Sequence, residues 1–281
     1  MKIGLALGGG SARGLAHFGV IDVLLENGVS IDCVAGTSMG AVVGAAYAAG
    51  KHEEFKELSL SMDIWKLMNF IEPSLPYKGF LDGKRISDIF EEKLGIDRIE
   101  QTNIPYCAVC CNFKTGESVN LRKGSISKAL RASMSIPGLF KPVKFGERVL
   151  VDGGVVDPVP VTAVREMGAD IVIAVDLNHY VLDRKDRGSK KVLASIEERL
   201  FPWNKGLPDI FSLMMDSLYT MEKTIADLKM EQDPPDILLQ PKVGDISFLE
   251  FYRAEEAILM GRREAEARIG DILSKTRTDR G

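Results

Sequence analysis

The stretch that decides the fold is residues 31–50, IDCVAGTSMGAVVGAAYAAG. It begins with a mostly apolar run at 31–35, turns at GTSMG (36–40) and continues as a run of small residues. A short apolar run that ends at glycine is typical of a buried strand, and small residues suit a helix packed close to a sheet. The stretch therefore predicts a strand, a sharp turn that carries Ser38, and a helix.

A similar unit precedes it, because residues 2–7 are an apolar run ending in glycines and a helical pattern follows from Leu15 to Asn27. Continuous apolar runs predict further strands at 104–113, 149–151, 170–176 and 236–240, and helical patterns occur at 85–94, 126–134 and 250–273. Buried parallel strands have this continuous apolar character. We therefore expect a three-layer α/β/α fold with a mainly parallel sheet.

Length and composition fit one domain. The chain has 281 residues, of which 45% are hydrophobic and 27% are charged. We expect a single domain over 1–281, with a core at about 1–176 and a C-terminal helical part with one further strand at about 192–273. Residues 181–191 are rich in charge and predict a mobile loop, and the last eight residues, 274–281, are expected to fray.

Charge and hydropathy argue against several classes of protein. The formal net charge is −4, which disfavours a nucleic-acid partner. The apolar run from Ile3 to Leu7 is too short for a signal peptide, and no stretch approaches the roughly 18 apolar residues of a membrane span. We expect a cytoplasmic protein, and a peripheral contact with a membrane is compatible with the sequence.

The cysteines do not form a metal-binding pattern. Cys107 and Cys110 have the spacing C-x-x-C, but no second Cys or His pair follows at ligand spacing. The segment PYCAVCCNF, which also holds Cys111, is more typical of a buried strand, and Cys33 lies in another apolar run. We expect neither a metal ion nor an organic cofactor.

Ser38 is the centre of the G-x-S-x-G pattern. Gly36 and Gly40 remove side chains that would clash in a sharp turn, which leaves the serine hydroxyl accessible. The first amides of the following helix point toward the serine and stabilise a negative intermediate there. The pentapeptide alone is common, but the strand before it and the helix after it make Ser38 a candidate nucleophile.

A glycine-rich loop, GGGSARG (8–14), follows the first predicted strand. A nucleotide-binding module is one alternative, but Arg13, Gly14 and Leu15 stand where a P-loop ends in Gly, Lys and Ser or Thr. Arg13 also replaces the last small residue of a dinucleotide-binding loop. Unobstructed amides at a helix start can bind an anion. If Ser38 is a nucleophile, the loop is the natural oxyanion hole, with Arg13 holding it by a polar contact; a tight turn without a ligand is the other interpretation.

A serine nucleophile needs a base, and histidine is the usual one. We expect His17 to be a packed helix contact and His52, in a charged helix start, to be solvated. His179 follows a predicted strand and completes the order Ser38, Asp152, His179 of α/β-hydrolase triads. Those enzymes have several strands before the nucleophile, whereas two precede it here, so the triad is the second choice.

Asp152 offers the other base. It ends a short apolar run, and Gly153 and Gly154 turn the chain directly after it. Catalytic side chains lie at the carboxyl ends of parallel strands. Because Asp-Gly-Gly is also a common turn, the assignment depends on Ser38.

Four motifs in one order closely resemble the patatin-like phospholipases, in particular their compact bacterial members: GGGSARG (8–14), GTSMG (36–40), ASMSIPGLFKP (132–142) and DGGVVDPVP (152–160). The likeness spans about 1–176. It implies a patatin-like fold and a serine lipid acyl hydrolase of the phospholipase or lysophospholipase type, acting on a lipid or other acyl ester. A catalytically silent lipid-binding or scaffold protein is the remaining alternative.

The resemblance also implies roles for residues. Ser38 becomes the nucleophile and Asp152 the base, as a dyad without histidine, and the amides of Gly9, Gly10 and Ser11 become the oxyanion donors. The resemblance also implies residues that support the glycine loop and the sharp turn at 36–40, here called the elbow: Gly8, Arg13, Gly14, Gly36, Gly40, Gly153 and Gly154.

Asp157 departs from the family, which often has Asn five residues after the dyad aspartate, and we interpret this position as shaping the turn. Ser133 and Ser135 are expected to bond local backbone.

Residues 55–81 are dense in apolar and methionine side chains directly after the elbow helix. We expect a mobile lipid-facing cap over Ser38, with Lys56 and Lys66 at anionic headgroups and Trp65 at the lipid boundary. Packing of these side chains as ordinary core is the alternative.

Overall fold

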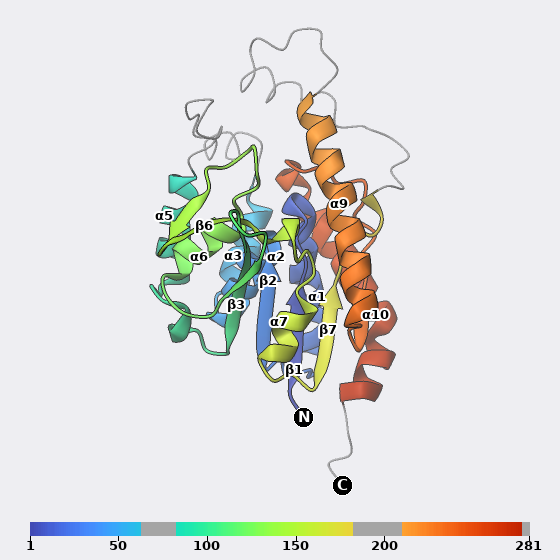
Figure 1. Ribbon diagram of the computed structural model, residues 1–281. Coiled ribbons are helices and arrows are strands. Elements are labelled where there is room, and N and C mark those ends of the chain that lie inside the picture. The colour runs from blue at the N-terminus through green and yellow to red at the C-terminus, as the bar shows by residue number, and fades with distance from the viewer. Residues whose placement is uncertain (63–82, 182–209, 277–281) are drawn as a thin grey trace.

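A β-sheet separates two layers of helices in the computed structural model, which describes residues 1–62, 83–181 and 210–276 (Figure 1). Within these residues each strand pairs with the next in the series β5 (Val143–Phe145), β6 (Arg148–Asp152), β3 (Tyr106–Asn112), β2 (Cys33–Thr37), β1 (Ile3–Leu7), β7 (Ile171–Val175) and β8 (Ile237–Leu239), and β4 (Ser118–Leu121) also pairs with β3. Strands β3, β2, β1, β7 and β8 are parallel. The expected three-layer fold with a mainly parallel sheet is confirmed.

The antiparallel part of the sheet differs from the expectation. The run at 149–151 is strand β6, but β6 pairs antiparallel with β3, as β4 does, and β5 pairs antiparallel with β6. Strands β4 and β5 have four and three residues and were not predicted. Such short strands leave little periodic signal in the sequence.

Helices cover both faces of the sheet. On one face lie α1 (Ala16–Glu26), which follows the 3₁₀ helix η1 (Ser11–Leu15), α2 (Met39–Ala48), α3 (His52–Leu60), α5 (Lys84–Leu94), α6 (Ile126–Ser133) and α10 (Ala254–Thr276). On the other lie α7 (Val161–Glu166) and α9 (Ile210–Gln232), visible in front of the strands in Figure 1. Short 3₁₀ helices η3 (Ile99–Gln101), η4 (Gly153–Val155) and η6 (Phe251–Arg253) complete the elements.

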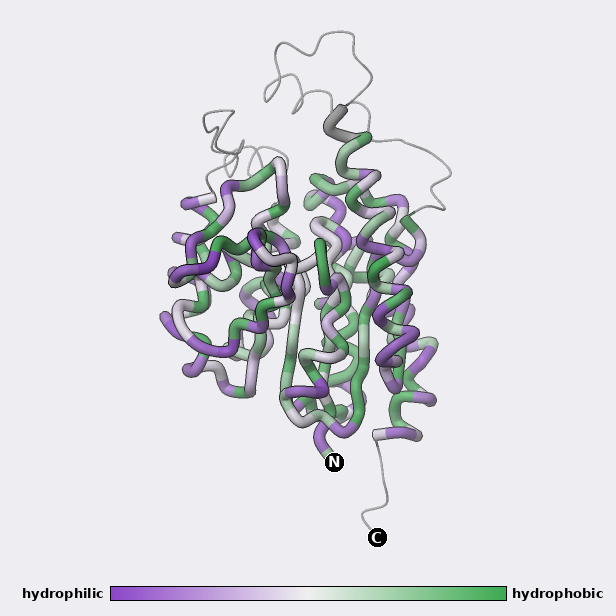
Figure 2. The backbone as a smooth tube through the Cα atoms, in the orientation of Figure 1, coloured by the Kyte–Doolittle hydropathy of each residue, from purple (hydrophilic) through white to green (hydrophobic). Residues whose placement is uncertain are grey.

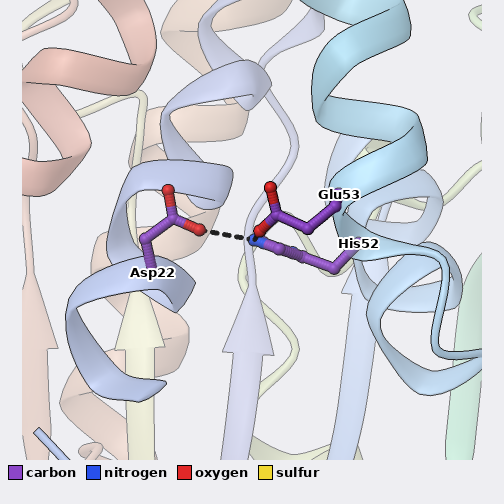
Figure 3. A group of neighbouring side chains, drawn as sticks. All are labelled: Asp22, His52 and Glu53. Carbon is purple, nitrogen blue, oxygen red and sulfur yellow. Dashed lines mark hydrogen bonds and ion pairs between the residues drawn. The ribbon is translucent and has the colours of Figure 1, made fainter. Parts of the chain in front are cut away.

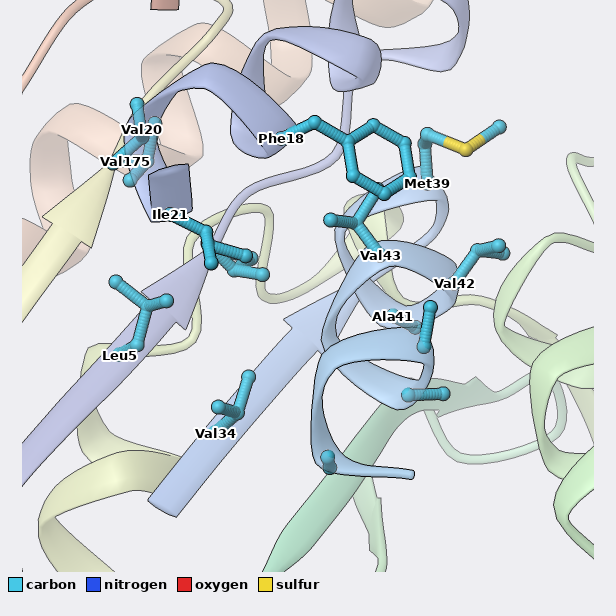
Figure 4. Packing of buried hydrophobic residues seen from close by; sticks show 14 of the residues in the cluster. Leu5, Phe18, Val20, Ile21, Val34, Met39, Ala41, Val42, Val43 and Val175 are labelled. Atoms are coloured by element: carbon cyan, nitrogen blue, oxygen red, sulfur yellow. The ribbon is translucent and has the colours of Figure 1, made fainter. Parts of the chain in front are cut away.

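The core lies between the central strands and helices α1 and α2. Leu5 and Val34 from the sheet face Phe18, Ile21 and Val43 from the two helices, and all five side chains are buried (Figure 4). Hydropathy follows this arrangement, because apolar residues concentrate along the central strands and polar residues along the outer sides of the helices (Figure 2). Burial of apolar surface on both faces is what holds parallel strands in the middle of a sheet.

The C-terminal helix α10 packs closely on α1. A Cβ at Gly261 would collide with the Ala16 carbonyl oxygen, and one at Gly19 would collide with the Ile258 carbonyl oxygen. The expected strand at 236–240 is β8, parallel to β7. Helix α10 runs to Thr276, so the expected fraying is wrong for residues 274–276, and 277–281 lie outside the described residues. No helix in the described ranges has the length and apolar character needed to cross a membrane.

Candidate active site

Ser38 lies at the junction of β2 and α2. Its backbone has φ 55° and ψ −123°, a left-handed conformation that side chains rarely adopt. A Cβ at Gly36 would collide with the Gly40 carbonyl oxygen, and a Cβ at Gly40 would collide with the Leu7 carbonyl oxygen. The two glycines therefore allow the sharp strand-to-helix turn that the sequence predicts.

A hydrogen bond from a distant segment fixes this turn. The Ser38 amide donates to Ser133 Oγ at 2.9 Å, and the Ser133 hydroxyl donates to the Val109 carbonyl oxygen at 2.7 Å. The expectation that Ser133 bonds local backbone is wrong, because its partners are 95 and 24 residues away. Ser135 does bond locally, since its hydroxyl donates to the Arg131 carbonyl oxygen at 2.8 Å.

Sheet pairing brings Asp152 to Ser38. Strand β2 pairs with β3 up to Thr37 opposite Val109, and β6 pairs with β3 from Cys110 onward, with Asp152 opposite Cys110. Strand β4 overlaps both of these regions, so it occupies the other edge of β3. Strands β2 and β6 therefore lie along the same edge and run toward each other, and their carboxyl ends meet. Asp152 reaches the site from an antiparallel strand rather than from the expected parallel one.

The Asp152 carboxyl is buried, with 2% of the residue exposed. Its Oδ1 accepts a hydrogen bond from the Gly154 amide at 2.8 Å, and Oδ2 has no partner of full hydrogen-bond geometry among the described residues. Burial raises the pKa of Asp152 to about 7, against the lowering effects of the Gly154 amide and the nearby Ser38 hydroxyl. Catalytic hydrogen bonds are often incompletely aligned without substrate. The carboxyl is thus a stronger base than an exposed aspartate.

The glycine loop lies beside the serine, because a Cβ at Gly9 would stand 3.5 Å from Ser38 Cβ. The Gly8 amide donates to the Val175 carbonyl oxygen at 3.0 Å, and the Gly9 amide donates to the Pro158 carbonyl oxygen at 2.9 Å. The Gly9 amide is therefore already bonded, which corrects the expected set of three oxyanion donors.

Gly10 and Ser11 provide the remaining amides of this set. Neither amide makes a backbone hydrogen bond within the described part of the chain. Ser11 has φ 50°, and its hydroxyl donates to the Phe248 carbonyl oxygen at 2.7 Å. That bond holds a strained residue in place next to the cavity that Ser38 lines.

Buried contacts hold the start of the first helix. Arg13 is fully buried, its amide donates to the Gly10 carbonyl oxygen, and its guanidinium lies 4.0 Å from the centre of the Tyr219 ring. A Cβ at Gly14 would collide with the Met39 side chain. Arg13 thus contacts the loop through its backbone amide and α9 through the stacking of its guanidinium on Tyr219.

The turn after Asp152 is tight. The Asp157 amide donates to the Gly153 carbonyl oxygen at 2.7 Å, and the Thr37 hydroxyl donates to the Asp157 carbonyl oxygen at 2.8 Å. The Asp157 carboxylate pairs with Lys229 of α9 at 3.0 Å. These contacts agree with the interpretation of Asp157 as a residue that shapes the turn.

Two histidines are buried and bonded to residues other than Ser38 and Asp152. His17 Nε2 donates to the Gly8 carbonyl oxygen at 2.8 Å, and burial lowers the pKa of His17 to about 4, so it is the packed contact that we expected. The expectation for His52 is wrong. Helix α3 packs back toward α1, so His52 is 7% exposed and its Nε2 bonds Asp22 Oδ1 at 2.7 Å (Figure 3).

His179 lies beside two carboxylates. Its ring nitrogen groups with oxygens of Asp176 and Asp227 within 4.8 Å. Among the hydrogen bonds of the described residues, none joins His179 to Ser38 or Asp152, and His179 does not line the cavity at Ser38. The histidine triad is therefore not assembled in this structure.

The four cysteines are buried and free, in β2 and β3, as expected for strand residues. Burial raises the thiol pKa values of Cys33, Cys107, Cys110 and Cys111. They behave as small apolar side chains of the sheet.

An apolar cavity of about 170 Å³ opens beside Ser38. Apart from three serines, its wall is apolar and comes from α2, α3, α5 and the segments around η6 and after α6, and it includes Leu15, Met39, Val42, Phe55, Leu58, Met62, Phe90, Ile136, Leu139, Phe248 and Leu249. Apolar cavities of about 150 Å³ admit a benzene ring. This one has room for a short length of an acyl chain next to the serine.

The first part of the expected cap borders this cavity, since Phe55, Leu58 and Met62 line it. Lys56 does not have the expected role at headgroups, because its ammonium pairs with Asp22 at 3.0 Å and with Glu53 at 2.8 Å. Trp65 and Lys66 lie outside the described residues, as does the expected loop 181–191 beyond its first residue.

Comparisons with known proteins identify the family and the fold. The family model described as patatin-like phospholipase matches residues 5–165. An uncharacterized NTE family protein of Mycobacterium bovis is 42% identical over 177 residues, which cover 63% of this chain and 49% of that protein. The lysophospholipase NTE1 of Debaryomyces hansenii is 28% identical over a match that covers 94% of this chain and 18% of that protein. The chain thus spans half or less of the length of these relatives. The crystal structure of VipD from Legionella pneumophila shares the fold, with a TM-score of 0.52 at 15% identity over 96% of this chain and 66% of that chain. The chain belongs to the patatin-like phospholipase family.

Proposed function

We propose that the chain hydrolyses acyl esters of lipids, with Ser38 as nucleophile and Asp152 as the only side-chain base. The observation that supports the proposal is that the carboxyl ends of β2 and β6 meet, so that a strained serine, which lines an apolar cavity, lies close to a buried carboxyl. Site geometry of this kind supports acyl transfer, because it combines a nucleophile, a base and a binding surface for an acyl chain.

The first step forms an acyl-serine. Asp152 takes the proton of the Ser38 hydroxyl as Oγ attacks the ester carbonyl carbon, and the negative charge moves to the carbonyl oxygen. The amides of Gly10 and Ser11 are the donors that we assign to this oxyanion. Collapse of the tetrahedral intermediate breaks the bond to the alcohol, which leaves with the proton from Asp152.

The second step repeats this chemistry with water. Asp152, ionised again, takes a proton from a water molecule, whose oxygen attacks the acyl carbon. The second tetrahedral intermediate collapses, Ser38 regains a proton from Asp152, and the fatty acid leaves. The raised pKa of Asp152, about 7, fits both halves of this cycle, because the same group must accept and return a proton near neutral pH.

The cavity and the relatives support a lipid substrate. The wall beside Ser38 is apolar along α2, α3 and α5, which suits an acyl chain better than a charged headgroup. A relative named lysophospholipase matches 94% of this chain. We therefore propose a lysophospholipid or a similar acyl ester as substrate; cytoplasmic location and a peripheral membrane contact remain predictions.

The test is release of fatty acid from a panel of lysophospholipids, diacyl phospholipids and acylglycerols by the purified chain. We expect release from at least one long-chain ester, labelling of Ser38 by a fluorophosphonate, and loss of both in Ser38→Ala. Fatty-acid release that persists in Ser38→Ala would exclude this nucleophile. A folded wild-type chain that neither hydrolyses any ester nor takes the label would favour the silent lipid-binding alternative.

A further inference from the structure

A second buried carboxyl lies next to Asp152, on helix α9. Among the side chains of this helix that the structure describes, the buried ones are Met215, Tyr219, Glu222 and Ala226, which recur at the spacing of one helix face. Glu222 is 7% exposed, in a stripe that is otherwise apolar or aromatic. A carboxyl in such a stripe is costly unless specific partners offset its burial.

Glu222 contacts the turn that carries the proposed base. Its Oε2 accepts a hydrogen bond at 3.1 Å from Nδ2 of Asn178, a residue that follows β7. Its Oε1 lies against Gly154, because a Cβ on Gly154 would collide with it and would stand 3.2 Å from Asp152 Oδ1. The Gly154 amide is the donor to Asp152 Oδ1, so the carboxyls of Glu222 and Asp152 flank the same glycine. Glycine at 154 is what permits this approach.

The charges that face Glu222 come from two other elements. Asp152, the last residue of β6, repels a charged Glu222, and Arg13 of η1 attracts it. On α9 itself the Tyr219 ring stacks against the Arg13 guanidinium. Asn178 adds a neutral donor from the loop after β7. Burial, together with Asp152, raises the pKa of Glu222 to about 8, so its carboxyl is mainly neutral at pH 7.

We propose that Glu222 is a positioning residue for Asp152. The neutral carboxyl of Glu222 holds the Asp152–Gly154 turn so that Asp152 faces Ser38. When Glu222 loses its proton, two negative charges flank Gly154, and the attraction of Arg13 draws Glu222 away from the turn. The inference rests on the proposed function of Asp152. It extends that function to α9, which lies on the opposite face of the sheet from α2 (Figure 1).

The test compares the pH dependence of kcat on a soluble short-chain ester for the wild type and Glu222→Gln. Glutamine keeps the size and the acceptor for Asn178 but cannot ionise. Both should rise through pH 7 as Asp152 ionises; above about pH 8 the wild type should decline while Glu222→Gln stays level. Glu231→Gln, at an exposed position of the same helix, is the control and should follow the wild type.

Truncation provides a second measurement. Glu222→Ala removes the contact with Asn178 and with the turn, so kcat should fall roughly 10- to 100-fold with KM unchanged, and Glu222→Gln should restore it at pH 7. Identical pH profiles for the wild type and Glu222→Gln would overturn the proposal even if Glu222→Ala failed to fold. Asp152→Asn is measured alongside. If it is active, the proposed function fails; if it is inactive while both Glu222 variants match the wild type, only the role of Glu222 fails.

Discussion

Ser133 holds Ser38 in its strained conformation through a hydrogen bond of 2.9 Å from the Ser38 amide to Ser133 Oγ. The same hydroxyl donates to Val109 of β3, so helix α6, strand β3 and the nucleophile turn are joined through one side chain. Backbone strain at a functional residue persists only where the surroundings enforce it.

Loss of this contact should affect both stability and turnover. Ser133→Ala removes the acceptor of the buried Ser38 amide, which should cost about 1–3 kcal/mol of unfolding free energy. Turnover should fall roughly tenfold or more, because Ser38 is less well placed. Ser135→Ala is the matched control: it removes a buried hydroxyl of the same segment that bonds Arg131, so stability falls while kcat stays near wild type. Equal kcat losses in both variants would contradict a specific role for Ser133.

A methyl group should be tolerated by the fold at Gly9 of the glycine loop but not at Gly40 of the turn around Ser38. Gly9→Ala should fold, because its Cβ would stand at an ordinary 3.5 Å from Ser38 Cβ, but the methyl group would obstruct the approach to the nucleophile and lower kcat. Gly40→Ala should not fold stably, since its Cβ would collide with the Leu7 and Gly8 carbonyl oxygens. Thermal unfolding and ester hydrolysis of the two variants measure this difference. Wild-type turnover in Gly9→Ala would show that the substrate does not approach Ser38 past Gly9.

Ionisation of the buried Asp152 carboxyl should lower the unfolding free energy as the pH rises. Its folded-state pKa of about 7 is above the ordinary value of 3.8, so the unfolded chain ionises first, and the contribution to stability is lost as the pH rises through 7. Asp152→Asn should therefore be more stable than the wild type by on the order of a few kcal/mol above pH 7, and the advantage should shrink toward pH 4. Urea unfolding at pH 5 and pH 8.5 tests this. An advantage of equal size at both pH values would contradict the buried, raised-pKa carboxyl.

Chain-length preference should depend on Val42, which lines the cavity one helical turn after Ser38. Val42→Trp should fill the space, so hydrolysis of a long-chain ester should fall at least about tenfold relative to an acetyl ester. Val42→Ala should leave the preference for long chains intact. Rates on a series of acyl lengths give the answer, and a loss in Val42→Trp that is the same for acetyl and long-chain esters would place the acyl chain elsewhere.

The local parts of the site could be predicted from sequence. Ser38 between an apolar strand and a helix of small residues, and the glycines at 36 and 40, follow from steric rules that act over five residues. The central parallel strands were also predictable, because strands such as β1 and β7 are buried on both faces and have continuous apolar sequences.

The remaining features depend on tertiary contacts. A three-residue run around 150 does not encode its direction, so the antiparallel approach of Asp152 appears only in the sheet pairing. His52 stands among charged residues but bonds Asp22, 30 positions earlier on α1. Glu222 did leave a signal, because it occupies the apolar stripe of α9 at helical spacing from Tyr219 and Ala226. That stripe could have marked it as a buried acid before the structure.

The most direct test of the Ser38–Asp152 assignment is the rate of ester hydrolysis by Asp152→Asn beside His179→Ala, at pH 8 and with folding confirmed by circular dichroism. Asparagine cannot accept the Ser38 proton, so Asp152→Asn should lose at least about 1000-fold in kcat/KM. His179 makes no hydrogen bond to either dyad residue among the described contacts, so His179→Ala should stay within a few-fold of the wild type. A folded His179→Ala as inactive as Asp152→Asn would contradict the dyad and restore the histidine triad.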